Sequence, residues 1–377
     1  MSVAKRLALP RNTLARHLLL AALAGVALFL LTSSVSEFTN FRFTQIAYFL
    51  IAAAGLTILT GLNGQLSLGH GGLMAIGGYT TGMMLKHTSA PLLGVLAASI
   101  LTTMLVGIVV GISAARLRGP YLAGITLALA LALPDIATKY ESTFGGEQGL
   151  QVEQPTPPSA LLAPEFIGRW LAWISFAAAL VTLVLLANLR RSRRGRLWRA
   201  VRDDEVASAL AGIHVAGTQV RAFVVSAACA GLAGSLFVYS ANLAAPSSFD
   251  ITLSLQLVTA IVIGGLGTLS GAVWGALLLV YLPAWSDSLA KTFSLSSEVK
   301  DNLPSAIYGL ALIVAMLAFP HGIQGVLKRI WERVGPGRKR REEQVEGDAD
   351  EVVDVVADSA PSGAIESAQM EGDPSER

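Results

Sequence analysis

Long apolar stretches alternate with short polar ones over most of this 377-residue chain. A helix that crosses a bilayer needs roughly 20 predominantly apolar residues, and ten stretches approach that length. They lie at about 17–33, 44–62, 66–86, 91–114, 119–138, 166–188, 219–244, 251–268, 268–284 and 303–320, with the eighth and ninth fused. The pattern predicts an all-α polytopic membrane protein with about ten transmembrane segments, including helices broken by glycine.

The composition agrees with a membrane protein. The chain is 53% hydrophobic and 14% charged, whereas a soluble domain is about 25% charged. Residues 342–377 hold twelve acidic residues and one arginine, a formal charge of −11, so the rest carries +13 and the whole chain +2. This basic excess sits in short stretches between apolar runs, which indicates anchoring at membrane lipid and argues against nucleic-acid binding.

The charge distribution also predicts an orientation. Lys and Arg concentrate in short cytoplasmic loops. With a cytoplasmic N-terminus, the inner segments would be 115–118, 189–218 and the stretch after the last span, and all three are rich in Arg or Lys. The predicted outer loop, 139–165, instead carries four glutamates against one lysine. We therefore expect a multi-pass protein of the plasma (inner) membrane with both termini in the cytoplasm.

Three segments are expected along the chain. Residues 1–40 would form a cytoplasmic start and the first transmembrane helix, because the N-terminal apolar run lacks a cleavage site followed by a soluble domain. Residues 41–330 would form the main transmembrane domain. Residues 331–377 turn from basic to acidic and have no aromatic residue after Trp331, so we expect a disordered cytoplasmic tail.

The third apolar run contains an unusual stretch, GLNGQLSLGHGGLMAIGGYTTG at 61–82. One interpretation is close helix packing through small residues. The other is a broken helix, because unwound backbone at membrane depth is tolerated only inside protein or beside water. Polar neighbours favour a half-helix start near Leu73, whose free N–H groups would suit a substrate carboxylate. The candidate substrate-path residues here are Asn63, Gln65, Ser67, Gly69, His70, Gly71 and Gly72.

A second interruption occurs in AIVIGGLGTLSGAVWGALLL at 260–279. Paired glycine interruptions are a sequence pointer to the path of a transporter. The candidate path residues here are Gly264, Gly265, Gly267, Thr268 and Ser270. His70 alone is ambiguous, since an intramembrane histidine is either a hydrogen-bonded packing residue or a proton carrier.

Sequence motifs for chemistry are missing from the chain. No lysine follows a glycine, so no nucleotide-binding P-loop is present, and the five histidines show no metal-ligand spacing. No G-x-S-x-G motif of a serine hydrolase occurs, and Cys229 is the only cysteine. We expect a protein that is not an enzyme and needs neither cofactor nor metal, and that draws any energy for pumping from a partner or an ion gradient.

Five ordered motifs resemble one family. GLNGQLSLGHGGLMAIGGYTTGMM resembles the GxxGQLSLGHxxFMAIGAY signature of the branched-chain amino-acid ABC transporter permeases, particularly the LivM-type subunit. Further similarities are TFGGEQGLQV, the stretch from GRLWRAVRDDEVASALAGIH onward, LVTAIVIGGLGTLSGAVWGALLL and NLPSAIYGLALIVAMLAFPHGIQG. The resemblance covers about residues 40–330, and the N-terminal 40 residues and the acidic tail lie outside it.

The resemblance implies an importer that works by alternating access. Its partners would be a homologous second permease subunit, two ATP-binding-cassette ATPases that hydrolyse ATP, and an external substrate-binding protein. The ATPases would dock on the inner loop, whose helical periodicity is visible in the sequence. The implied coupling residues are Arg199, Asp203, Glu205, Ala207 and Gly212. The binding protein would dock on the outer loop at Phe144, Gly145, Gly146 and Gly149.

Other functions remain open at this point. A urea or short-chain amide permease of the same superfamily would carry nearly the same signature. A gradient-driven secondary transporter would need no ATPase, but carboxylates are scarce in the predicted spans. A membrane scaffold would also have glycine-rich packing, although it would not need an ordered outer loop together with an inner coupling loop.

Overall fold

The computed structural model describes residues 13–115, 120–152, 166–292, seven positions between 303 and 314, and 322–334. Residues 1–324 form one compact unit and residues 325–377 a second. Of the predicted features, the loop around Arg116 and Arg118, most of the 303–320 span and the acidic tail lie outside the described residues.

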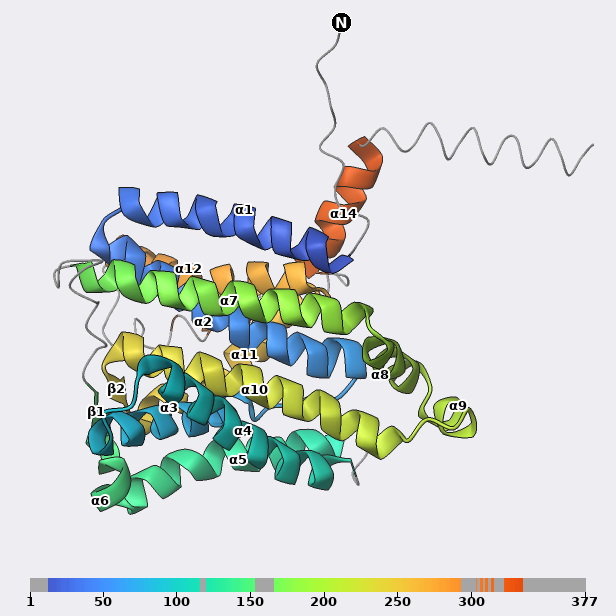
Figure 1. The fold of residues 1–377 in the computed structure, drawn as a ribbon, viewed down its shortest axis with the longest axis horizontal. Coiled ribbons are helices and arrows are strands. Elements are labelled where there is room, and N and C mark those ends of the chain that lie inside the picture. The colour runs from blue at the N-terminus through green and yellow to red at the C-terminus, as the bar shows by residue number, and fades with distance from the viewer. Residues whose placement is uncertain are drawn as a thin grey trace, which may run out of the picture. The chain divides into compact units, whose positions relative to one another are not determined.

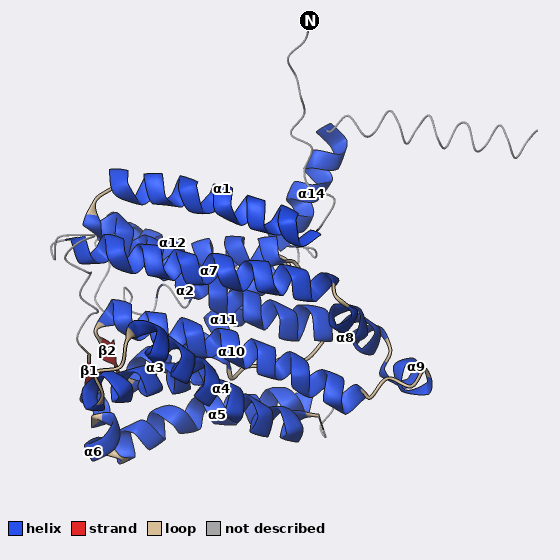
Figure 2. Cartoon of the chain, in the orientation of Figure 1, coloured by secondary structure: helices blue, strands red, loops and turns tan. Residues whose placement is uncertain are grey.

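The described chain is almost entirely helical, which confirms the predicted all-α polytopic fold (Figure 2). Seven helical segments within the described residues are long and apolar enough to cross a membrane. They are α1 (Thr13–Ser34), α2 (Glu37–Leu56) continued by the π-helix η1 (Thr57–Leu62), α4 (Leu92–Ala114), α5 (Pro120–Lys139), α7 (Ile167–Arg191), α10 (Val215–Ala241), and the short 3-10 helix η4 (Pro246–Phe249) followed by α11 (Ile251–Gly264). Two further helices lie at predicted positions: α3 (His70–His87), which is not apolar enough to count among these seven, and α12 (Leu269–Thr292), whose apolar part is Leu269–Trp285. Helix α14 (Gly322–Val334) follows the undescribed stretch.

Helix α10 lies at the centre of the bundle, against α2, α3 and α4 (Figure 1). Most residues in the apolar stretches of α2 and α10 are buried, whereas no residue in the most apolar stretch of α1 is buried. Small residues make this packing possible. A side chain on Gly77 of α3 would collide with the backbone of Gly231 in α10, and one on Gly107 of α4 with Ala227. The helices therefore approach to backbone contact, as small residues allow in membranes.

The two ends of the bundle carry different short elements (Figure 1). At one end lie α8 (Arg193–Asp203) and α9 (Glu205–Leu210), which confirm the helical content predicted for the inner loop. At the other end lie α6 (Glu141–Phe144), the 3-10 turn η2 (Gly146–Gln148) and the strands β1 (Leu150–Gln151) and β2 (Leu243–Ala244). The strands pair antiparallel, with Leu150 opposite Ala244.

Candidate functional site

The first glycine stretch is a broken helix, as predicted. The helix that begins at Glu37 ends with the π-helical turn η1 at Leu62, and α3 begins at His70 after a non-helical segment. His70 lies beside the backbone of Ala52, ten residues before Leu62, which corresponds to about 15 Å along a helix. Residues 63–69 therefore run back alongside the helix that precedes them. We call residues 61–71, which add the last residues of η1 and the first residues of α3 to this segment, the first break.

Hydroxyl groups from distant helices satisfy the backbone of the first break. Leu68 N–H donates to Thr126 Oγ1 of α5 at 3.0 Å. Gly71 N–H donates to Ser254 Oγ of α11, also at 3.0 Å. From η1, Thr60 Oγ1 donates to the Gln65 carbonyl at 3.1 Å. Irregular backbone at membrane depth needs such partners, so α5 and α11 hold the start of α3 in place.

Three polar side chains at the first break are buried with unsatisfied atoms. Among the described residues, both side-chain polar atoms of Asn63 and Oε1 of Gln65 have no hydrogen-bond partner, and the His70 ring, beside the Ala52 backbone, makes no hydrogen bond of standard geometry. Each of the three residues is at most 6% exposed. Ser67 is also fully buried, but its Oγ accepts from Gly69 N–H at 3.4 Å. Since an unsatisfied buried polar group costs about 1–3 kcal/mol, such a cluster calls for a functional explanation.

The glycines of this stretch lie at the helix break and also allow close helix packing, so both interpretations of the sequence apply. Gly69 lies against the Thr126 carbonyl, which positions the break on α5. A Cβ on Gly71 would lie 2.7 Å from Ser254 Oγ, and one on Gly72 would lie 3.1 Å from Ala130 Cα. The structure thus brings Gly69, His70, Gly71 and Gly72 together at the start of α3, where they pack against α5 and α11. The Gly71 N–H, one of the groups expected to receive a carboxylate, is already bonded to Ser254.

The second glycine stretch is a tight turn between α11 and α12. Helix α11 ends at Gly264, and Gly265 and Gly267 have positive φ angles of 122° and 78°. Thr268 closes the turn: its hydroxyl donates to the Gly265 carbonyl at 3.0 Å and accepts from Gly271 N–H at 3.1 Å. Ser270, in the first turn of α12, is exposed. We call residues 265–268 the second break.

The two breaks touch each other. A Cβ on Gly61, in the last turn of η1, would collide with the backbone of Gly267. This contact joins two of the predicted path segments, which are separated by about two hundred residues in the sequence.

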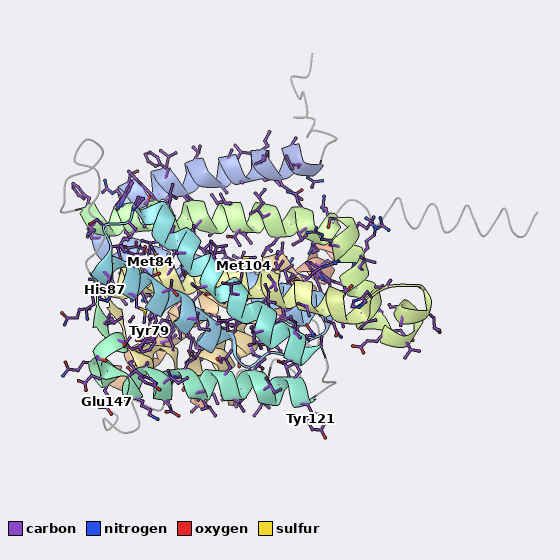
Figure 3. The ribbon with its side chains drawn as sticks, turned by 60° about the horizontal axis from the view of Figure 1, so that its bottom comes forward. Tyr79, Met84, His87, Met104, Tyr121 and Glu147 are labelled. Carbon is purple, nitrogen blue, oxygen red and sulfur yellow. The ribbon has the colours of Figure 1, made fainter. Side chains whose placement is uncertain are left out.

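The predicted outer-loop residues form a compact structure. Phe144 ends α6, Gly145 caps it, and Gly146 begins η2. The Phe144 ring packs edge-on against Tyr79 of α3 with the centroids 5.3 Å apart. Gly149 lies directly against the Ala244 carbonyl, where a side chain would not fit. Tyr79, His87 and Glu147 lie near this end, and Tyr121 near the opposite end of α5 (Figure 3). Residues 153–165 of the loop lie outside the described chain.

The predicted coupling residues lie on α8, α9 and the turn after them. Arg199 and Asp203 are exposed on α8, and Ala207 is exposed on α9. Glu205 accepts a hydrogen bond from Gln219 Nε2 of α10 at 2.7 Å. Gly212 follows α9 with a φ of 79° and open space around it.

Sequence reasoning missed several residues that organise these sites. Asp204 caps α9 by accepting from the N–H groups of Val206 and Ala207, and buried Trp198 donates to the Thr218 carbonyl. Thr126 and Ser254 hold the first break. The cap was visible in the sequence as an Asp before a short apolar-periodic segment. Single hydroxyl residues in apolar helices give no such signal. Among the residues that the structure describes, no group of His, Cys, Asp or Glu could hold a metal ion.

Comparison with known proteins connects these features to one family. Residues 38–318 match the family described as the permease component of branched-chain amino acid transport systems. The chain is 29% identical over 263 residues to the high-affinity branched-chain amino acid transport system permease protein LivM of Escherichia coli, covering 62% of this chain and 60% of that protein. It is also 26% identical over 300 residues to the permease protein LivH of Salmonella typhimurium, covering 73% of this chain and 90% of LivH. No solved structure matches the chain.

The match includes both breaks, the outer loop and the inner helices α8 and α9. The chain spans about 60% of the length of the LivM relatives that it matches. Because the family match covers most of its residues, this multi-pass membrane protein belongs to the permease components of branched-chain amino acid transport systems.

Proposed function

We propose that this chain is a permease subunit of an ATP-binding-cassette importer that carries branched-chain amino acids across the inner membrane by alternating access. The observation that carries the proposal is the set of buried, unpartnered polar groups on Asn63, Gln65 and His70, at a helix break in a chain of this family. A translocated amino acid brings a carboxylate and an ammonium group, which can satisfy such donors and acceptors in passing.

The surroundings of the first break suit an apolar side chain. Leu59, Leu62 and Leu73 are buried within a few residues of the unpartnered groups. Because Gly71 N–H is bonded to Ser254, the carboxylate of the substrate would meet the Asn63 and Gln65 amides, or the α3 N-terminus once Ser254 has turned away.

A second permease subunit and lipid would cover the exposed apolar faces of the bundle. Leu93, Leu101, Leu105 and Val109 of α4 are each at least 59% exposed. The chain is similar to both LivM and LivH, two proteins that are each named as a permease of a high-affinity branched-chain amino acid transport system. We propose a homologous subunit as the partner on the membrane side, and a substrate-binding protein at the outer loop around Phe144 and Gly149.

The ATPases would dock on α9. Val206 and Leu210 are one helical turn apart and are 65% and 85% exposed, although neither lies in a transmembrane segment. An exposed apolar pair beside the basic helix α8 suits a groove on a cytoplasmic protein. The basic residues of α8 and of the last turn of α7 support a cytoplasmic location for α8 and α9. We propose that both termini are cytoplasmic as well.

The test is uptake of radiolabelled leucine into proteoliposomes that contain the chain, its candidate permease and ATPase partners, and the binding protein. We expect uptake that requires both ATP and the binding protein, with excess urea having no effect. Uptake of urea instead would overturn the proposed substrate, and uptake without ATP that collapses with a protonophore would overturn the mechanism.

A separate variant tests the docking surface. Replacing Leu210 with Glu should lower copurification of the ATPases with the permease at least tenfold. Ala209→Glu is the control, because Ala209 is exposed on the same helix but extends no large apolar side chain. Equal copurification of both variants with the ATPases would place the docking surface elsewhere.

A further inference from the structure

The side chain of Arg202, in α8, lies where the two breaks are in contact. Arg202 Nη1 donates to the carbonyl of Gly61, in the last turn of η1. The same atom lies 3.9 Å from the position of a Cβ on Gly267, in the second break. The Arg202 stem passes the first break as well, because a Cβ on Gly64 would lie 2.9 Å from Arg202 Cγ. Arg202 thus lies against residues of both breaks.

The positive charge of Arg202 complements the negative C-terminal end of the helix that ends beside it. The last carbonyls of a helix have no partner within the helix, and the aligned peptide dipoles make a C-terminus negative. The helix from Glu37 to Leu62 ends here, and its terminal carbonyl at Gly61 accepts from the guanidinium. Gly64 has a φ of 78° and no side chain, which leaves room for the arginine stem.

Helix α8, which carries Arg202, and the adjoining α9 are both hydrogen-bonded to α10. Trp198 of α8 is buried and donates to the Thr218 carbonyl of α10 at 3.1 Å. Glu205 of α9 is bonded to Gln219 of the same helix at 2.7 Å. Asp204, between α8 and α9, caps α9. These contacts join α8, α9 and the start of α10, so a force applied to α9 also acts on Arg202.

We propose that Arg202 is the positioning residue that transmits movement of α8 and α9 to both glycine breaks. The inference rests on the proposed function, because the movement would come from the partner ATPases. A displacement of α8 must either pull η1 with it or break the Arg202–Gly61 hydrogen bond. Because Gly61 and Gly267 are in backbone contact, movement of η1 also reaches the second break.

The test compares three variants in the reconstituted importer, with leucine uptake and ATP hydrolysis measured on the same vesicles. Arg202→Gln removes the charge, and we expect uptake to fall at least tenfold while hydrolysis stays within twofold of the unsubstituted complex. Arg202→Lys keeps a positive charge near Gly61 and should restore part of the uptake per ATP. Arg221→Gln is the control: Arg221 lies exposed on α10 outside the inner loop, makes no hydrogen bond to the described residues, and its loss should leave both rates unchanged.

Several outcomes would overturn the inference. If both rates fall together in Arg202→Gln, or if neither Arg202 variant assembles with its partners, the residue has a structural role only. If uptake per ATP is unchanged in Arg202→Gln, the coupling runs elsewhere. These results differ from failure of the proposed function, in which the unsubstituted complex itself shows no ATP-dependent leucine uptake.

Discussion

The two glycine breaks have similar compositions but are stabilised in different ways. The first break spans eleven residues, and its backbone depends on hydroxyl groups from α5 and α11. The second break spans four residues, and its own Thr268 closes it. The first break contains buried polar side chains without partners, whereas the second exposes Leu266. The unsatisfied buried groups, which distinguish the first break from the second among the described residues, are the reason that we propose substrate contact there.

This difference also separates two mechanical roles. A break held by other helices changes its geometry when those helices move, so a shift of α5 or α11 would act on the start of α3. A turn closed by its own residues moves as one piece. We therefore propose substrate contact at the first break and a hinge between α11 and α12 at the second.

The largest effect is expected where the two breaks touch. Gly61→Ala places a Cβ against the backbone of Gly267, where no flexible side chain can move aside. Overpacking typically costs 1–3 kcal/mol, and a backbone clash belongs at the upper end, about 3 kcal/mol. The melting temperature of the purified protein in detergent, at one fixed scan rate, should fall by several degrees.

Gly124→Ala is the matched control for that variant. Gly124 lies in α5, and no atom lies within 4 Å of the position that a Cβ would occupy there. Alanine is favoured over glycine inside a helix by about 1 kcal/mol, so the control should melt at the same temperature or slightly higher. Equal melting temperatures for the two variants would mean that the breaks are not in contact.

Asn63→Leu tests whether the unpartnered groups serve the substrate. Loss of a hydrogen bond to a charged group costs about 1.5–3 kcal/mol, so leucine uptake at low concentration should fall ten- to a hundredfold. The melting temperature should hold or rise, because an unsatisfied polar group is replaced by an apolar one of similar size.

Ser254→Ala provides the contrast within the same region. Ser254 Oγ accepts from Gly71 N–H, so its removal should lower the melting temperature, unlike the change at Asn63. An Asn63→Leu protein that melts as early as Ser254→Ala would show that Asn63 supports the fold.

Thr126→Val measures how much the break depends on α5. The variant leaves Leu68 N–H without its acceptor, and interhelical hydrogen bonds in membrane proteins contribute about 0.6 kcal/mol on average and at most about 1.7. We expect a loss of about 1 kcal/mol, read as a lower melting temperature. Thr138→Val is the control on the same helix, because the Thr138 hydroxyl bonds only to the carbonyl of Pro134. A similar fall in melting temperature in both variants would show that the hydrogen bond from Leu68 N–H to Thr126 does not stabilise the break.

The sequence predicted where the helices break but not what holds the breaks. Glycine and polar residues at 61–72 and 264–271 are local signals, and helix ends follow from local backbone preferences. The partners Thr126 and Ser254 lie 58 and 183 residues away from the groups that they bind. Nothing in an apolar helix marks which hydroxyl will face a particular N–H, because that depends on how the helices pack. Arg202 was visible only as one of many basic residues in the inner loop.

The smallest effect is expected at the second break, from Thr268→Ala. Thr268 precedes α12 and accepts from Gly271 N–H at 3.1 Å, the bond of a helix N-cap. Replacing such a cap by alanine costs about 1 kcal/mol, and Thr268→Ser should restore the stability because serine keeps the hydroxyl. If Thr268 is part of a hinge and not of the substrate site, the apparent KM for leucine should stay within twofold in both variants. A large rise in KM for Thr268→Ala that serine reverses would instead place this hydroxyl in contact with the substrate, and would give the two breaks the same role.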